Sequence, residues 1–203
     1  MIIRREEQKD FEETENLTRE AFFNVYRPGC FEHLVVHKLR NDKSFVKDLD
    51  YIIVEDNKII ANIVYAEGTI NLKNGEKKNI LTFGPVSVLP EYQKKGYGAK
   101  LIEYTMEKAK ELGYSAIIIT GNPDYYKRFG FVSASNYNIY YEGTNTLDDA
   151  PYFMICILDE ETFKIKGGYY KDPSCYNVSE EEVRDFDKKF PPKKKKKRPG
   201  QLE

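Results

Sequence analysis

Apolar and polar residues along this chain first follow a helical pattern. Residues 2–4 form a short apolar run, and the polar stretch behind it carries an apolar stripe at Phe11, Leu17, Ala21 and Phe22. Proline and glycine in "NVYRPGC" end this helix, and a second helix is predicted over residues 31–40. The chain therefore opens with a strand and two helices.

The next segment predicts a β-hairpin. Two β-branched runs, residues 51–54 and 59–65, are joined by a short turn at Asp56 and Asn57. Such runs around a tight polar turn are typical of antiparallel strands.

A third strand is predicted in "NILTFGPVSVLP", residues 79–90. Pro85 follows Gly84 inside it and has no N–H to donate to a neighbouring strand. We therefore expect a bulge or a break in pairing there, which leaves backbone groups open to another partner.

Helical periodicity returns after residue 96 and ends at Gly113, a natural helix stop. The following "YSAIIITG", residues 114–121, is apolar enough to be buried on both faces, as in a parallel crossover. Strand, helix and strand together predict one βαβ unit.

A short helix opened by Asn122 and Pro123 comes next, then a turn at Gly130, a further strand, and a last strand over residues 152–158. The order of elements predicts a mixed α/β domain over residues 1–158.

The composition changes after this domain. Residues 159–177 are loop-like, and Ser179 caps a predicted helix. "PPKKKKKRPGQLE" has the composition of a disordered segment. We expect an appendage with a short helix over residues 159–190 and a basic disordered tail over residues 191–203.

Charge and hydropathy exclude several classes of partner. The 203 residues include 32 basic and 33 acidic ones, so there is no chain-wide field for nucleic acid. The lysine tail could bind nucleic acid, anionic lipid or an acidic protein by charge alone, but a solubilising disordered end is the preferred interpretation, and nucleic acid is not an expected partner. No apolar run approaches the roughly 20 residues that span a bilayer, and the N-terminus lacks a signal-peptide core. We expect a cytoplasmic protein without a membrane partner; a homodimer is compatible with the sequence.

The three cysteines are odd in number and have no CxxC spacing, so a disulfide framework is not expected. Cys30, His33 and His37 would still need a fourth zinc ligand. Two histidines one turn apart on a helix face are the simpler interpretation, and we predict no metal.

The junction "VLPEYQKKGYGAKLIEYTMEKAKELGY", residues 88–114, places two glycines where a strand meets a helix. A P-loop would need GxxxxGK[ST], which the chain lacks, and a dinucleotide fingerprint would need a third glycine after Gly96 and Gly98. A helix N-terminus with glycines still suits a pyrophosphate, because unpaired N–H groups point at it.

A third kind of site fits better. Gln93, Gly96, Gly98 and Ala99 match the Q/RxxGxG/A loop of the Gcn5-related N-acetyltransferases (GNAT), and "PDYYKRFGF" is similar to that family's "FYxxxGF" segment. The sequence resembles small bacterial members over residues 2–158. The resemblance implies the GNAT fold, with a mostly antiparallel central sheet of six to seven strands flanked by helices and a central βαβ unit for acyl-CoA.

The resemblance also implies where acetyl-CoA binds. The pyrophosphate is expected on the loop over residues 93–99. The pantetheine is expected along the third strand, with a backbone amide of Val86 or Val88 facing the thioester oxygen. Asn122 is expected to contact the pantetheine, unless it only caps the short helix. The expected cofactor-binding residues are Val86, Ser87, Val88, Gln93, Lys94, Lys95, Gly96, Tyr97, Gly98, Ala99 and Asn122.

Tyr126, five residues before Phe131, matches the family tyrosine that protonates the departing thiolate, although packing against CoA is the alternative. The family often has a glutamate as general base where this chain has Thr82, which cannot serve. We assign no base, and the candidates weighed are Glu67, Glu91, His33 and His37.

The resemblance implies an N-acetyltransferase that moves the acetyl group of acetyl-CoA to an unidentified primary amine by direct attack through a tetrahedral intermediate. The alternative is a catalytically inactive module that binds CoA, and Thr82 is its best support.

Overall fold

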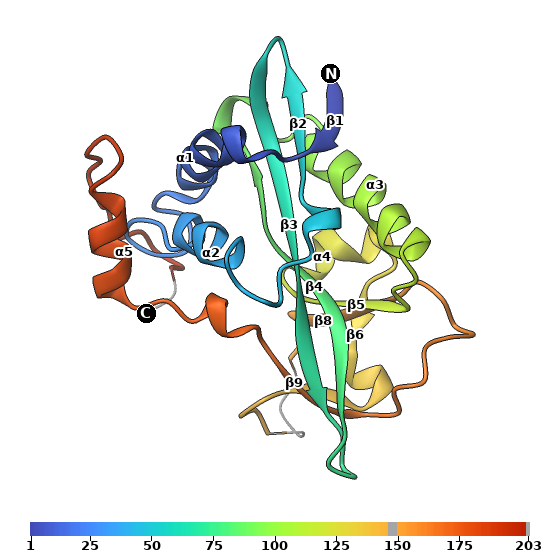
Figure 1. Cartoon of the computed structure of the whole chain (residues 1–203). Coiled ribbons are helices and arrows are strands. Elements are labelled where there is room, and N and C mark those ends of the chain that lie inside the picture. Colours follow the sequence, from blue (N-terminus) through green and yellow to red (C-terminus); the bar gives the residue numbers. More distant parts are fainter. Residues whose placement is uncertain (146–149, 202–203) are drawn as a thin grey trace. The chain divides into compact units, whose positions relative to one another are not determined.

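The computed structural model describes residues 1–145 and 150–201 (Figure 1). The helices are α1 (Phe11–Phe22), α2 (Glu32–Leu39), α3 (Tyr97–Glu111), α4 (Pro123–Tyr126) and α5 (Glu180–Asp187). The strands are β1 (Ile2–Arg5), β2 (Tyr51–Glu55), β3 (Lys58–Asn71), β4 (Lys77–Val88), β5 (Ala116–Thr120), β6 (Val132–Ser133), β7 (Ile139–Tyr141), β8 (Phe153–Ile157) and β9 (Gly168–Lys171).

The strands pair in the order β1–β2–β3–β4–β5–β8–β6, and β9 pairs with both β3 and β7. The β4–β5 and β7–β9 pairs are parallel. The pairs β1–β2, β2–β3, β3–β9, β5–β8 and β6–β8 are antiparallel. The expected mixed, mostly antiparallel sheet with a βαβ unit is confirmed. The expected number of six to seven strands is not confirmed, because the described residues form a sheet of nine strands.

The chain divides into two compact units, each described by itself. The first unit comprises Met1–Val64, Pro85–Ile102 and Ser174–Glu203, and the second comprises Tyr65–Gly84 and Glu103–Pro173. The expected boundaries at residues 158 and 190 follow composition and stay a prediction.

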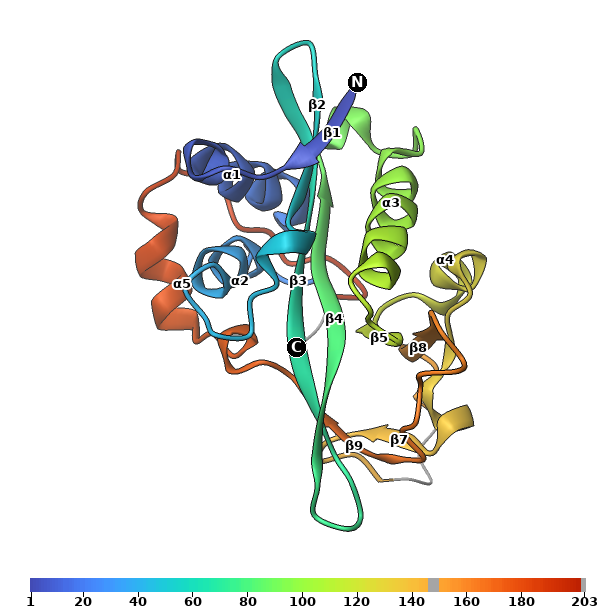
Figure 2. The same ribbon diagram turned by 45° about the vertical axis from the view of Figure 1, so that its right-hand side comes forward.

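In the first unit, β1, β2 and the start of β3 form an antiparallel sheet with α1, α2 and α5 on one side (Figure 2). The predicted hairpin turn is present: Asp56 and Asn57 have φ of +49° and +60°, values that asparagine and aspartate tolerate well. Helix α5 carries the predicted cap, since Ser179 and Glu182 bond to each other's backbone N–H.

In the second unit, β5 lies between β4 and β8, and its apolar residues are buried as expected. The core includes Ile70, Ile80, Ala116, Ile118, Ala134, Ile139, Phe153, Ile155 and Tyr170. The segment 159–177 was predicted as a loop, and this is wrong at β9. Gly167 and Gly168, which indicated a loop, let the backbone approach closely: a Cβ on Gly168 would lie 2.6 Å from the carbonyl oxygen of Asn71.

No helix in the described part of the chain is long and apolar enough to cross a membrane.

Candidate functional site

The turn over residues 93–99 joins β4 to α3 in the first unit. A 3₁₀ turn over Pro90–Tyr92 precedes it, and the first helical hydrogen bond of the turn runs from the N–H of Lys100 to the carbonyl of Gly96 at 3.0 Å. The N–H groups of Tyr97, Gly98 and Ala99, which precede this bond, therefore have no acceptor within the helix. The turn itself is mostly exposed.

Backbone conformation explains one of the two glycines. Gly96 has φ +88°, which a residue with a Cβ adopts only with strain, and a Cβ built there would meet nothing within 4 Å. Gly98 lies inside the first turn of α3 and is not among the glycines with positive φ, so turn geometry does not explain it. Lys94 also adopts a positive φ, +60°, which a residue other than glycine rarely does.

Side chains around the turn hold it in place. The amide Nε2 of Gln93 donates to the carbonyl of Val88 at 3.0 Å, and the hydroxyl of Tyr97 donates to Glu55 at 2.7 Å. This hydrogen bond to Glu55 raises the pKa of Tyr97. The ammonium of Lys95 lies 5.3 Å from the ring centre of Tyr92. The turn is thus preformed by contacts within the first unit.

The strand segment before the turn alternates as a pleated strand should. Val86 and Val88 are half-buried, while Ser87 between them is buried and donates to Thr18 of α1 at 3.1 Å. The side chain of Ser87 therefore has a structural partner inside the first unit, and a contact of Ser87 with the cofactor stays a prediction. Gly84, where the irregularity was expected, has φ +148°. Strand β4 pairs with β5 upstream of it, at Leu81 and Thr82.

Tyr126 ends α4 in the second unit and stands among aromatic rings. Its ring centre lies 6.0 Å from that of Phe83, 5.8 Å from Phe131 and 5.0 Å from Tyr125. The ring is half-buried. Its position is set by packing from several strands and turns rather than by α4 alone.

Gly121 lies against the ring of Tyr126, and the sequence motif did not identify it. A Cβ built on it would lie 2.5 Å from Cε2 of Tyr126 and 2.9 Å from Cδ2. Its φ is ordinary, so the glycine is needed for space rather than for backbone conformation. The only sequence signal is a glycine directly before "NPDYY".

Asn122 caps α4, because its Oδ1 accepts from the N–H of Asp124 at 2.9 Å. This supports the capping alternative raised from its spacing. A contact with pantetheine stays a prediction.

Of the four candidate bases, Glu67, Glu91 and His37 are bonded to other side chains, and His33 is buried. Glu67 accepts from Asn79 at 2.8 Å and from Tyr114 at 3.2 Å. Glu91 is paired with Lys58 at 2.8 Å, and that hydrogen bond lowers the pKa of its carboxyl.

His33 is completely buried against Phe186 and Phe190, and burial lowers its pKa to about 4. It is neutral at pH 7 but has no access to a substrate. His37 bonds through Nδ1 to Glu15 at 2.8 Å. Thr82, at the family's glutamate position, is 3% exposed and has no basic group.

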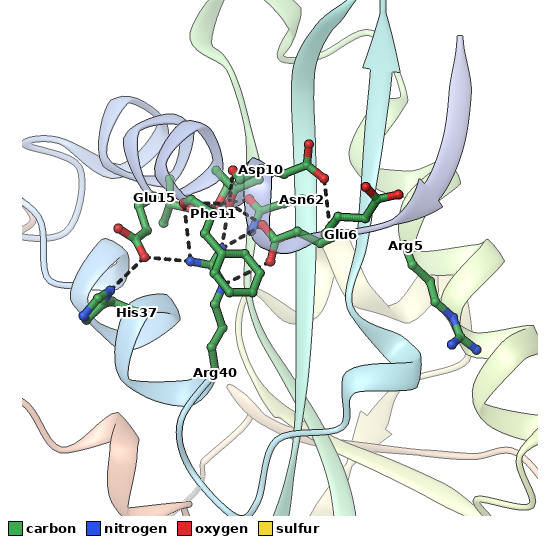
Figure 3. Close-up of polar contacts among 12 residues, drawn as sticks. Arg5, Glu6, Asp10, Phe11, Glu15, His37, Arg40 and Asn62 are labelled. Carbon is green, nitrogen blue, oxygen red and sulfur yellow. Dashed lines mark hydrogen bonds and ion pairs between the residues drawn. The ribbon is translucent and has the colours of Figure 1, made fainter.

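A buried polar network lies near His37 in the first unit (Figure 3). Arg40 binds both oxygens of Glu6 at 2.7 and 3.0 Å, Glu15 at 2.7 Å and the hydroxyl of Thr14 at 2.6 Å. Its side chain is 3% exposed and that of Glu6 0% exposed. Burying an arginine is tolerated because its guanidinium is satisfied by carboxylates, so the network is structural.

Among the described residues, no group of three or more His, Cys, Asp and Glu side chains is arranged to hold a metal ion. Cys30 instead contacts Glu32 at 3.3 Å, and burial raises the pKa of its thiol.

A mixed sheet that leads through a glycine turn into the N-terminus of a helix defines an α/β protein, and anions in proteins are often bound at such helix N-termini. A family model described as "Acetyltransferase (GNAT) domain" matches residues 2–134, more than half of the chain. The chain belongs to the GNAT acetyltransferase family.

Two curated relatives come from Escherichia coli K12. YjhQ, named an uncharacterized N-acetyltransferase, is 29% identical over 99 residues, which are 48% of this chain and 53% of YjhQ. The matched part thus spans about half the length of that relative. YhbS, with the same description, is 26% identical over 140 residues, which are 68% of this chain and 78% of YhbS.

Solved structures share the fold. E. coli YhbS in complex with CoA superimposes with a TM-score of 0.73 at 21% identity, covering 87% of this chain and 92% of YhbS. A GNAT acetyltransferase from Brucella melitensis in complex with acetyl-CoA gives a TM-score of 0.69 at 25% identity, covering 87% and 97%.

Proposed function

We propose that this chain is an N-acetyltransferase that moves the acetyl group of acetyl-CoA to a primary amine. The observation that carries the proposal is the turn from Gln93 to Ala99, where a glycine with positive φ opens a helix N-terminus in a chain of the GNAT family. The two neighbours in complex with CoA and acetyl-CoA add support.

The proposed donor contacts follow from the chemistry of each group. The backbone N–H groups of Tyr97, Gly98 and Ala99 would bind the pyrophosphate, because they have no acceptor within the helix and carry the positive end of the helix dipole. Exposed Lys94 and Lys95 would add positive charge near the phosphates. A backbone amide of Val86 or Val88 would donate to the thioester oxygen as it becomes an oxyanion.

In the transfer step, the neutral amine attacks the thioester carbonyl and forms a C–N bond. The tetrahedral intermediate then collapses, the C–S bond breaks, and the thiolate takes a proton. Tyr126 is the proposed proton donor. No described carboxylate or histidine is assigned as the base, since the candidates are bonded elsewhere or buried, and water would carry the amine proton away.

Release of free CoA thiol from acetyl-CoA over a panel of primary amines tests this function. The expected result is amine-dependent thiol release with at least one amine, together with a product heavier by one acetyl group. Binding of acetyl-CoA without turnover on any amine would contradict it and favour an inactive CoA-binding module, for which Thr82 is the supporting observation.

A further inference from the structure

The lysine-rich end of the chain begins at a fixed place in the first unit. Asp187 of α5 accepts hydrogen bonds from Arg19 of α1 at 2.6 and 3.2 Å, and Arg19 is completely buried. Leu34 of α2 packs with Val183 and Phe186 of α5, which lies beside α2 (Figure 2). The segment of residues 193–201 therefore follows a helix that is held in place by α1 and α2.

Asn24, just after α1, makes main-chain contacts on both sides of Lys195. Its Nδ2 donates to the carbonyl of Lys194 at 3.1 Å, and its Oδ1 accepts from the N–H of Lys196 at 2.9 Å. The backbone oxygen of Asn24 accepts from the side-chain amide of Gln201 at 2.9 Å. An amide that bonds to the main chain before and after one residue recognises an extended peptide there.

Two lysine side chains add charge and shape to this contact. Nζ of Lys193 lies 2.6 Å from a carboxylate oxygen of Glu20 and 4.8 Å from the ring centre of Phe23. Lys195 passes over Gly29, where a built Cβ would lie 3.1 Å from its Cε. Glu20 and Phe23 thus contact the side chain of Lys193, and Gly29 leaves room for the side chain of Lys195.

We infer that residues 20–29, here called the Asn24 site, bind an extended lysine-containing peptide, and that residues 193–201 occupy this site within the same chain. Main-chain recognition by Asn24 tolerates variation around the two lysines, while Glu20 selects for positive charge. The hydrogen bonds of the peptide go to Asn24 rather than to Arg19 or Asp187, although the charge of Lys195 acts on Asp187. Helix α5 has its own anchors in the Arg19–Asp187 ion pair and the packing against α2, so the tail can leave the site while α5 stays in place.

Amide hydrogen exchange on the full chain tests the intramolecular part. The N–H of Lys196 should be protected in the wild type, and Asn24→Gly should speed its exchange at least about tenfold because a hydrogen bond is lost. Asn24→Gly keeps the backbone free to hold φ +62°, and Asn138→Gly, at φ +57°, is the matched control that should leave Lys196 unchanged. Unprotected exchange in the wild type, or equal protection in Asn24→Gly, would overturn the inference.

Binding in trans tests the peptide class. A full-length chain with Lys193, Lys195 and Gln201 replaced by serine and Lys196 by proline, which has no N–H for Asn24 to accept, should bind a fluorescent peptide of residues 191–201, measured by anisotropy. Replacing Glu20 by Gln in that chain should weaken binding severalfold, and adding Asn24→Gly should weaken it further, while Asn138→Gly should not. Absence of binding, or binding that neither site variant weakens, would contradict the peptide site. None of these readouts depends on acetyl transfer.

Discussion

The turn over residues 93–99 and the surroundings of Tyr126 differ in what holds them. The turn is exposed and defined by its backbone, with Gly96 at φ +88° and open space around it. Tyr126 is held by side chains from distant parts of the sequence, among them Phe83 and Phe131. A backbone-defined site is visible as a short motif, whereas a packed site depends on contacts that no short motif contains.

Removing the hydroxyl of Tyr126 is the strongest test of this contrast. Tyr126→Phe keeps the ring against Phe83 and Phe131 but removes the proposed acid, so kcat should fall about 100-fold. Steady-state thiol release measures the effect. Tyr125→Phe changes the adjacent tyrosine in the same way and should leave kcat within about twofold. An unchanged kcat in Tyr126→Phe would make Tyr126 a packing residue.

Crowding the ring tests whether position matters as well as chemistry. Gly121→Ala should push the ring of Tyr126, and we expect kcat to fall about tenfold with little change in KM for acetyl-CoA. Gly68→Ala is the matched control, because a Cβ there would clash with the ring of Tyr170, which has no proposed role in transfer. Both variants should lose stability through overpacking, about 1–3 kcal/mol. Equal losses of kcat in the two would remove Gly121 as a positioning residue.

Straining the turn addresses the other side of the comparison. Gly96→Ala and Gly75→Ala each add a Cβ at positive φ, +88° and +85°, with nothing within 4 Å. Both should therefore cost stability similarly, about 1 kcal/mol. Only Gly96→Ala should weaken acetyl-CoA binding, by about five- to tenfold as the turn relaxes. Titration calorimetry measures the dissociation constants, and a similar loss in Gly75→Ala would show a global effect.

Asp50, a buried carboxyl of the first unit, should affect the stability of the fold without affecting acetyl transfer. Burial, and then the nearby Glu6 carboxylate, raise the pKa of Asp50 well above its usual value, against the opposing charge of Arg40. A raised folded-state pKa means that the folded chain retains a proton that the unfolded chain, with a pKa near 3.9, has lost. The contribution of Asp50 to stability therefore falls as the pH rises from about 4 toward the raised pKa.

Asp50→Asn carries no charge to bury, so its stability relative to the wild type should increase from pH 4.5 to pH 8, by about 1 kcal/mol or more. Urea unfolding at both pH values measures this difference, and acetyl-CoA affinity should stay the same. A difference in stability that does not change with pH would show that Asp50 is ionised in the fold.

The sequence predicted the parts of this molecule that depend on local pattern. Helices α1, α2, α3 and α5, the hairpin turn at Asp56 and Asn57, and the cap at Ser179 follow from periodicity and turn chemistry. Strand β9 was missed because Gly167 and Gly168 have loop composition, and only their close approach to other backbone explains them.

The same division applies to the candidate site. The turn was found from "QKKGYGA", whereas Gly121 and the engagement of Glu67, His33 and His37 depend on contacts between residues far apart in the sequence. The contacts of Asn24 with residues 194–201 were also outside any local pattern, because the lysine run indicates a solvated segment.

The most direct test of the central claim is amide NMR of the 23.7 kDa chain titrated with CoA and, separately, with pantetheine, which lacks the pyrophosphate. If the turn binds the pyrophosphate of CoA, the N–H signals of Gly96, Tyr97, Gly98 and Ala99 shift when CoA is added and stay in place when pantetheine is added. Signals that do not move with CoA, or that move equally with both compounds, would contradict the account.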